Sequence, residues 1–120
     1  MNPIVKNMSY ADLTGAILTH VDLSHSILLA TTLTAANLTG ADLTGVDLTN
    51  AILTHAKLTG AILRNANLTA AILQDADLND ADLTGAILAL ADLTDADLTG
   101  AILALADLTG ANLTAVDLTN

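Results

Sequence analysis

The chain has 120 residues, a net charge of −10 and a single aromatic residue, Tyr10. An apolar fraction of 52% argues against disorder, and the near absence of aromatics predicts a thin core of small and medium aliphatic side chains. The absence of cysteine excludes disulfides and thiolate metal sites, and the acidic balance disfavours direct binding to nucleic acid or to an anionic membrane.

Residues 1–5 differ from the rest of the chain and contain its only proline, Pro3. We expect them to form an N-terminal extension that partly caps a single domain made by residues 6–120. The first ten residues lack the charged start and long apolar run of a secretion signal, and no apolar stretch is long enough to span a bilayer. We therefore expect a cytoplasmic protein that has no membrane partner.

Leucine occupies every fifth position from Leu13 to Leu118, and alanine stands two residues before it in 17 of these 22 repeats. A helix would spread the leucines around its circumference, and a straight strand would alternate them between its two faces. The pattern is satisfied if the chain bends once per repeat. Alanine and leucine then point inward, and the residue between them points outward.

The fifth residue of each repeat is the predicted corner. All seven glycines and all three histidines lie there, and these types tolerate a positive φ, as the third residue of a type II turn requires. Six corners carry residues that suit this turn poorly, and there we expect a different turn with a negative φ. These corners are Ala30, Ala35, Ala70, Ala115, Leu90 and Leu105.

The tandem motif Ala-(Asp/Asn)-Leu-x-x, seen in residues 41–45, resembles the pentapeptide repeat family, which has many cyanobacterial members. The resemblance extends over residues 6–120. It implies an all-β fold, a right-handed parallel quadrilateral β-helix in which four repeats form one coil of 20 residues, and hence about five to six coils. The leucines that then stack in the core include Leu43, Leu63, Leu83 and Leu103.

With 20 residues per coil, residues 20 apart form columns, and two outward surfaces become candidates for interaction. The first is acidic and contains Asp75, Asp77, Asp80, Asp95, Asp97 and Asp117. Stacked like charges repel one another, so this arrangement is costly. Either the acidic surface is functional or it only keeps the chain soluble, as a by-product of a motif that prefers Asp beside Leu.

The second surface is apolar and contains Ile87, Leu90, Ile102 and Leu105. Exposed apolar patches often mark interfaces, and tolerated exposure is the alternative. Residues 81–94 recur unchanged as residues 96–109, an offset of 15 that rotates the copy by one side and argues against a finely tuned active face. Self-association through this corner or through an uncapped C-terminal coil is a further expectation.

Catalysis is not expected. His20, His25 and His55 fall in different columns and cannot converge on a metal ion, and the carboxylates lie on a convex surface without a cleft. We expect no enzyme activity, no cofactor and no metal. The sequence instead predicts a structural or protein-interaction solenoid of unknown biological role that binds an unidentified protein.

The family resemblance implies an alternative. Some acidic family members mimic DNA, bind a topoisomerase and protect gyrase, and the charge of this chain permits that function. Ice binding through columns of threonine is a more remote alternative.

Overall fold

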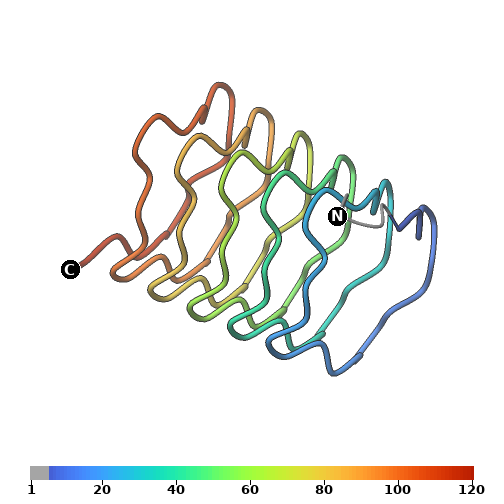
Figure 1. Ribbon diagram of the computed structural model, residues 1–120. Helices are drawn as coiled ribbons and strands as arrows, with labels where there is room; N and C mark the ends of the chain where they lie inside the picture. The colour runs from blue at the N-terminus through green and yellow to red at the C-terminus, as the bar shows by residue number, and fades with distance from the viewer. Residues whose placement is uncertain (1–5) are drawn as a thin grey trace.

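The computed structural model describes residues 6–120; the predicted N-terminal extension, residues 1–5, lies outside the described part. Within residues 6–120 the chain forms neither a helix nor a continuous strand, and each pentapeptide instead contributes one residue to a parallel β-bridge and then turns. The bridges join residues 20 apart, from Asn7 with Ile27 to Asp97 with Asp117. The chain therefore winds into a solenoid whose coils lie directly on one another (Figure 1).

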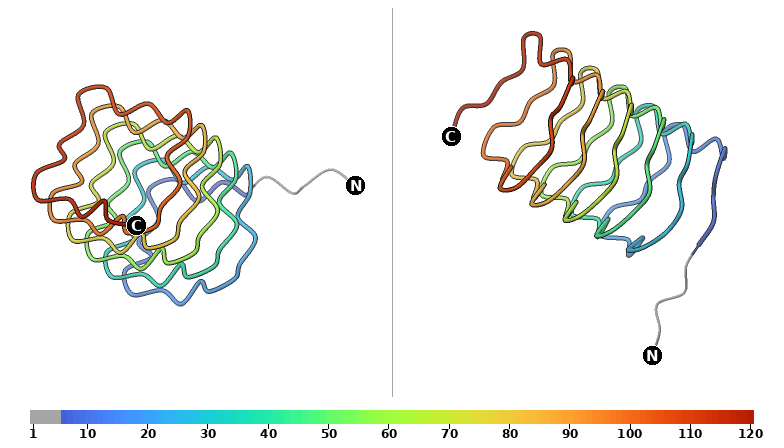
Figure 2. Two further views of the ribbon diagram at one scale, coloured as in Figure 1. Left: turned by 90° about the vertical axis from the view of Figure 1, so that its left-hand side faces the viewer. Right: turned by 90° about the horizontal axis from the view of Figure 1, so that it is seen from above.

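Backbone hydrogen bonds hold neighbouring coils together in a fixed pattern. In one central repeat, the N–H of Leu43 donates to the carbonyl of Ile62 at 2.7 Å, and the N–H of Gly45 donates to that of Arg64 at 2.8 Å. The carbonyl of Ala41 accepts from the N–H of Ile62 at 2.9 Å. Because these bonds reach only the next coil, stability is close to a sum over neighbouring coils. The coils keep the same outline along the whole axis (Figure 2).

The core is a column of leucine and alanine along the solenoid axis. Leu43 and Leu63 are fully buried and Leu83 is 1% exposed, as predicted. Burying one leucine contributes about 2 kcal/mol. Ser26 and Thr31 take the place of the inward alanine in two repeats and are buried as well.

The last coil, residues 101–120, is less buried than the central coils. Leu103, predicted to belong to the core, is only partly buried, because residues 101–120 have a neighbouring coil on one side alone. Further along the same coil, Leu113 and Leu118 are 40% and 54% exposed. The predicted burial is therefore complete at Leu43, Leu63 and Leu83, whereas Leu103 is only partly buried.

Every corner from Tyr10 to Ala115 has a positive φ, between 52° and 70°. The expectation of a negative-φ turn at six corners is therefore wrong. Their φ angles are 52° at Ala30, 56° at Ala35, 56° at Ala70, 55° at Ala115, 61° at Leu90 and 59° at Leu105. The physical reason is the register. The N–H after each corner closes the turn, as from Ala71 to the Leu68 carbonyl at 3.0 Å, and at corners up to Gly100 the corner N–H also donates to the next coil. These bonds outweigh the cost of the left-handed region, about 1–2 kcal/mol per residue.

Corner side chains extend towards the corner of the next coil. A Cβ placed on Gly45 would lie 2.6 Å from Nδ1 of His25, and one placed on Gly110 would lie 2.8 Å from Cδ2 of Leu90. Such a distance is shorter than a van der Waals contact, so a Cβ at either glycine would force the side chain of the preceding coil to move. Glycine at these two places leaves room for the large corner residue 20 residues earlier.

Candidate functional site

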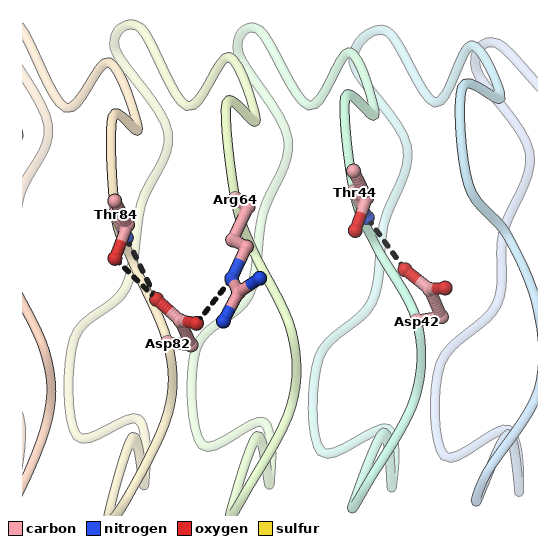
Figure 3. A network of polar contacts seen from close by, with 5 residues as sticks. All are labelled: Asp42, Thr44, Arg64, Asp82 and Thr84. Atoms are coloured by element: carbon pink, nitrogen blue, oxygen red, sulfur yellow. Dashed lines mark hydrogen bonds and ion pairs between the residues drawn. The ribbon is translucent and has the colours of Figure 1, made fainter.

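An outward Asp or Asn beside a leucine has a structural task. The N–H of Thr44 donates to Oδ1 of Asp42 at 3.0 Å, and Oδ1 of Asp82 accepts both the N–H of Thr84, at 3.0 Å, and its hydroxyl, at 2.6 Å (Figure 3). Among residues 6–120 these threonine N–H groups have no backbone acceptor, so the carboxylate supplies one.

The same bond is made in every repeat that has Asp or Asn at this position, 14 repeats in all. Sequence reasoning missed it, although the sequence carries a signal. Each of these residues is followed two positions later by Ser, Thr or Asn. The five repeats with a different residue there all have isoleucine beside the leucine, and they contain Leu29, Arg64, Gln74, Ala89 and Ala104.

These hydrogen bonds lower the pKa of the carboxyl groups that accept them. The pKa of Asp12, Asp97 and Asp107 lies below the ordinary value, first because of the threonine hydroxyl two residues on and second because of its N–H. The pKa of Asp82 is also lowered, chiefly by the Thr84 hydroxyl, with a smaller contribution from Arg64 in the preceding coil (Figure 3). These carboxylates are therefore ionised at neutral pH.

The predicted columns of the acidic surface are present. Parallel bridges join Asp77 to Asp97 and Asp97 to Asp117. The side-chain amide of Asn79 donates to Oδ1 of Asp77 at 2.6 Å and to Oδ2 of Asp97 at 2.9 Å. One neutral donor thus lies between two stacked carboxylates and offsets their repulsion.

At the corners beside this column, His55 Nδ1 lies 3.9 Å from Oδ2 of Asp75, and both side chains are at least half exposed. Asp80 extends towards Gly100. Within residues 6–120 no three His, Cys, Asp or Glu side chains are placed to hold a metal ion. The described chain also contains no helix long and apolar enough to cross a membrane. Asp75 and Asp80 therefore add exposed negative charge beside the column of Asp77, Asp97 and Asp117.

The predicted apolar surface is called here the apolar patch, and its members are Ile87, Leu90, Ile102 and Leu105. Their side chains are 41%, 66%, 51% and 90% exposed, respectively. Leu90 and Leu105 are corner residues of successive coils, whereas Ile87 and Ile102 are outward residues beside buried leucines.

The β-bridges and the corner contacts place the four side chains relative to one another. Ile87 bridges Asp107 in the middle of one side of the solenoid, while Leu105 begins that side in the later coil and Leu90 ends it in the earlier one. Ile102 lies around the corner on the adjoining side, where it bridges Asp82. The patch therefore crosses one side and continues around one edge.

The threonine columns are engaged in the turns. The hydroxyls of Thr14, Thr94 and Thr114 donate to the Asp or Asn two residues before them at 2.6 Å. Thr59, two residues after Lys57, donates to Asp77 in the next coil at 3.0 Å. These four threonine hydroxyls are therefore engaged within the fold.

A family model described as pentapeptide repeats (8 copies) matches residues 7–45, 26–65, 51–89, 61–100 and 91–120. The crystal structure of the pentapeptide repeat protein Rfr23 from the cyanobacterium Cyanothece 51142 is similar to this chain, with 30% identity over 93% of this chain and 90% of that chain and a TM-score of 0.91. HetL, a pentapeptide repeat protein from Nostoc sp. strain PCC 7120 involved in heterocyst differentiation regulation, is 32% identical over 92% of this chain and 73% of its own, with a TM-score of 0.60.

A third similar structure is alr5209, a pentapeptide repeat protein from Nostoc PCC 7120, which is 40% identical over 73% of this chain and 70% of its own, with a TM-score of 0.68. No curated protein sequence matches the chain. The family match and the structural likeness to Rfr23 agree with the five-residue period, the 20-residue register and the buried leucine column. The chain belongs to the pentapeptide repeat family.

Proposed function

We propose that the protein is a non-enzymatic interaction module that binds another protein through the apolar patch. The supporting observation is the pair of leucine corners: Leu90, which has a coil on each side, is 66% exposed, and Leu105, in the last coil, is 90% exposed. A leucine at such a corner raises the free energy of the folded chain in two ways, because its φ is positive and because its side chain is exposed to water. Glycine or asparagine would avoid both costs, so two leucine corners on one side support a use for the apolar surface.

The polar groups support a role without catalysis. Carboxylates that would serve as acids or bases are acceptors for turn N–H groups, and they lie on the outside of the coils. Acid–base catalysis needs a carboxyl group whose proton is released and regained near neutral pH, whereas the pKa of Asp82 and that of Asp107 are lowered. No cofactor is part of the proposal.

Topoisomerase binding by an acidic rod is the second candidate, and the stacked Asp77, Asp97 and Asp117 favour it. Two observations weigh against it. Ten of the thirteen aspartates accept hydrogen bonds from the turns of their own repeats, and these ten face several sides of the solenoid. A supercoiling assay tests it: unchanged gyrase activity with excess protein would exclude this function.

Self-association is the third candidate. It would use the apolar patch or the last coil, where Leu113 and Leu118 are exposed. Light scattering at several protein concentrations tests it directly. A molar mass that stays at that of one chain, 12.2 kDa, excludes both modes.

The proposed function is tested by photo-crosslinking from position 104, which adjoins Leu105, in a lysate of the source cells. We expect a crosslinked partner that disappears when Leu90→Asn and Leu105→Asn are combined. A crosslinker at position 17 provides the control, because Ile17 is 82% exposed in another column, where it bridges Asn37. Absence of a patch-dependent crosslink would contradict the proposed function.

A further inference from the structure

We propose that the partner of the apolar patch is an amphipathic helix with an aliphatic stripe flanked by lysine or arginine side chains. This inference rests on the proposed function, because it specifies the chemistry of the partner at the same surface. Three properties of the patch lead to it, namely its shape, its charge and the state of its backbone.

The shape of the patch suits one narrow apolar stripe. Leu105, Ile87 and Leu90 follow one another across a single side, from the corner at its start to the corner at its end. Ile102 extends the apolar surface around the first of these corners. The apolar residues of an amphipathic helix, at spacings of three and four, form a stripe of similar character.

The charge around the patch is negative. Asp107 bridges Ile87, and Asp92 is the outward residue of the side that begins after Leu90. Within residues 6–120, ion pairs form only between Arg64 and Asp82 and between His55 and Asp75, so Asp92 and Asp107 have no cationic partner there.

Both carboxylates at the edge of the patch are ionised at neutral pH, because threonine hydroxyls lower the pKa of Asp92 and of Asp107. With a net charge of −10, a second copy of the chain would bring like charges together around the patch. A partner with basic side chains beside its apolar stripe is complementary instead.

The backbone at Ile87 and Leu90 is already hydrogen-bonded, so an extended segment cannot pair with it at these two residues. The N–H of Ile87 donates to Ala66 at 2.9 Å and that of Leu90 donates to Thr109 at 2.9 Å. The carbonyl of Ile87 accepts from Leu68 at 2.7 Å. A partner that covers Ile87 and Leu90 must therefore satisfy its own backbone, as a helix does.

The test uses three labelled peptides of one length, each designed as a helix. The first combines a leucine stripe with lysine, the second replaces lysine by glutamate, and the third replaces leucine by serine. Fluorescence anisotropy should show that the leucine–lysine peptide binds the full chain about tenfold more tightly than either control, with an affinity that falls as salt is added. Equal binding of the glutamate peptide overturns the inference.

Matched variants identify the surface. Leu90→Asn with Leu105→Asn should weaken the leucine–lysine peptide about tenfold, because both apolar corner side chains are removed while a residue suited to positive φ is introduced. Asp92→Asn with Asp107→Asn should weaken binding and flatten its salt dependence. Asparagine keeps the turn acceptor, as it does at Asn112, whose Oδ1 accepts the N–H of Thr114 at 3.1 Å.

Asp77→Asn with Asp97→Asn serves as the control on another side, and it should leave peptide binding unchanged. If this control weakens binding as much as Asp92→Asn with Asp107→Asn does, the peptide follows overall charge and the inference is wrong. If the unmodified chain does not bind the leucine–lysine peptide but still gives the patch-dependent crosslink, the helical basic partner is rejected and the proposed function stands. If the chain gives neither peptide binding nor the crosslink, the inference and the proposed function are both rejected.

Discussion

The side-chain amide of Asn79 donates a hydrogen bond to Oδ2 of Asp97 in the next coil, at 2.9 Å. The same nitrogen donates to Asp77 at 2.6 Å. Most repeats have serine or threonine at this position, and a hydroxyl has only one hydrogen to donate. Asn79 therefore relieves the stacking of two carboxylates that a threonine would leave facing each other.

Asn79→Thr tests this relationship. The variant keeps a hydroxyl donor for Asp77 and loses the donor to Asp97, so the midpoint of urea unfolding should fall, more at low salt than at high salt. Combining it with Asp97→Asn should restore the midpoint, because one of the two charges is removed. An unchanged midpoint at low salt would contradict a stabilising role for the amide.

Acid should destabilise the fold through the turn carboxylates. Because the folded pKa of Asp12, Asp97 and Asp107 is lowered, their contribution to stability is present above the unfolded value, about 3.8, and is lost as the pH falls through the lower folded values. We expect the free energy of unfolding to change little between about pH 7 and pH 5 and to decline below about pH 4. Urea titrations followed by circular dichroism measure it. A rise in stability on acidification would show that relief of the −10 net charge dominates instead.

Replacing an alanine corner by glycine should stabilise the chain. Ala35 has a φ of 56°, and glycine adopts this conformation without the Cβ penalty, so Ala35→Gly should raise the free energy of unfolding by about 1 kcal/mol. The neighbouring Ala36 is fully buried, and Ala36→Gly should lower the same quantity. If both variants are destabilised equally, corner strain is not the controlling term.

Two glycines of one corner column should respond differently to alanine. A Cβ on Gly40 would overlap the imidazole ring of His20, whereas a Cβ on Gly60 would meet no atom within 4 Å. Their φ angles are 65° and 63°, so the backbone penalty is shared. Gly40→Ala should therefore cost about 1 kcal/mol more than Gly60→Ala in chemical denaturation. Adding His20→Ala should remove the difference, and a difference that persists would assign it to another cause.

Ser26 provides the last prediction. Its Oγ is buried and has no hydrogen-bond partner among the described residues, whereas the hydroxyl of Thr31 donates to the Leu28 carbonyl at 2.9 Å. Ser26→Ala restores the usual inward residue and should raise the free energy of unfolding by about 1 kcal/mol. Thr31→Ala should bring no such gain, because it removes a made bond. Thermal or urea unfolding of both variants provides the comparison.

The period of five was enough to predict which side chains lie inside and which residues stack. Leucine and alanine recur at fixed places, and a chain that buries them must bend once per repeat, as the burial of Leu43 and Leu63 confirms. The number of repeats per coil came from the family resemblance, and the bridges between residues 20 apart agree with it. The right hand of the winding stays a prediction.

The corner φ at Leu90 and Leu105 could not be predicted from local preference, because the bond that closes each turn, and at Leu90 the bond to the next coil, override that preference. The close approach of the Leu90 side chain to Gly110 arises only when two coils are placed together. The bond between Asp82 and Thr84 was within reach of sequence reasoning, since Asp or Asn directly before a repeat leucine is always followed two residues later by a residue able to donate.

The unchanged recurrence of residues 81–94 as 96–109 has a geometric consequence for the apolar patch. Had the copied block been one full coil long, a leucine at position 110 would have stood directly beside Leu90, and the Leu90 side chain, whose Cδ2 lies 2.8 Å from the position of that Cβ, would have had to move. A block of three repeats instead sets the second leucine at position 105, in the column of Gly85, where the preceding coil carries no side chain. In such a fold, a duplicated segment as long as one coil extends an apolar surface along the axis, whereas a segment of another length extends it around the circumference. A single duplication can therefore broaden an exposed apolar surface without disturbing the solenoid beneath it.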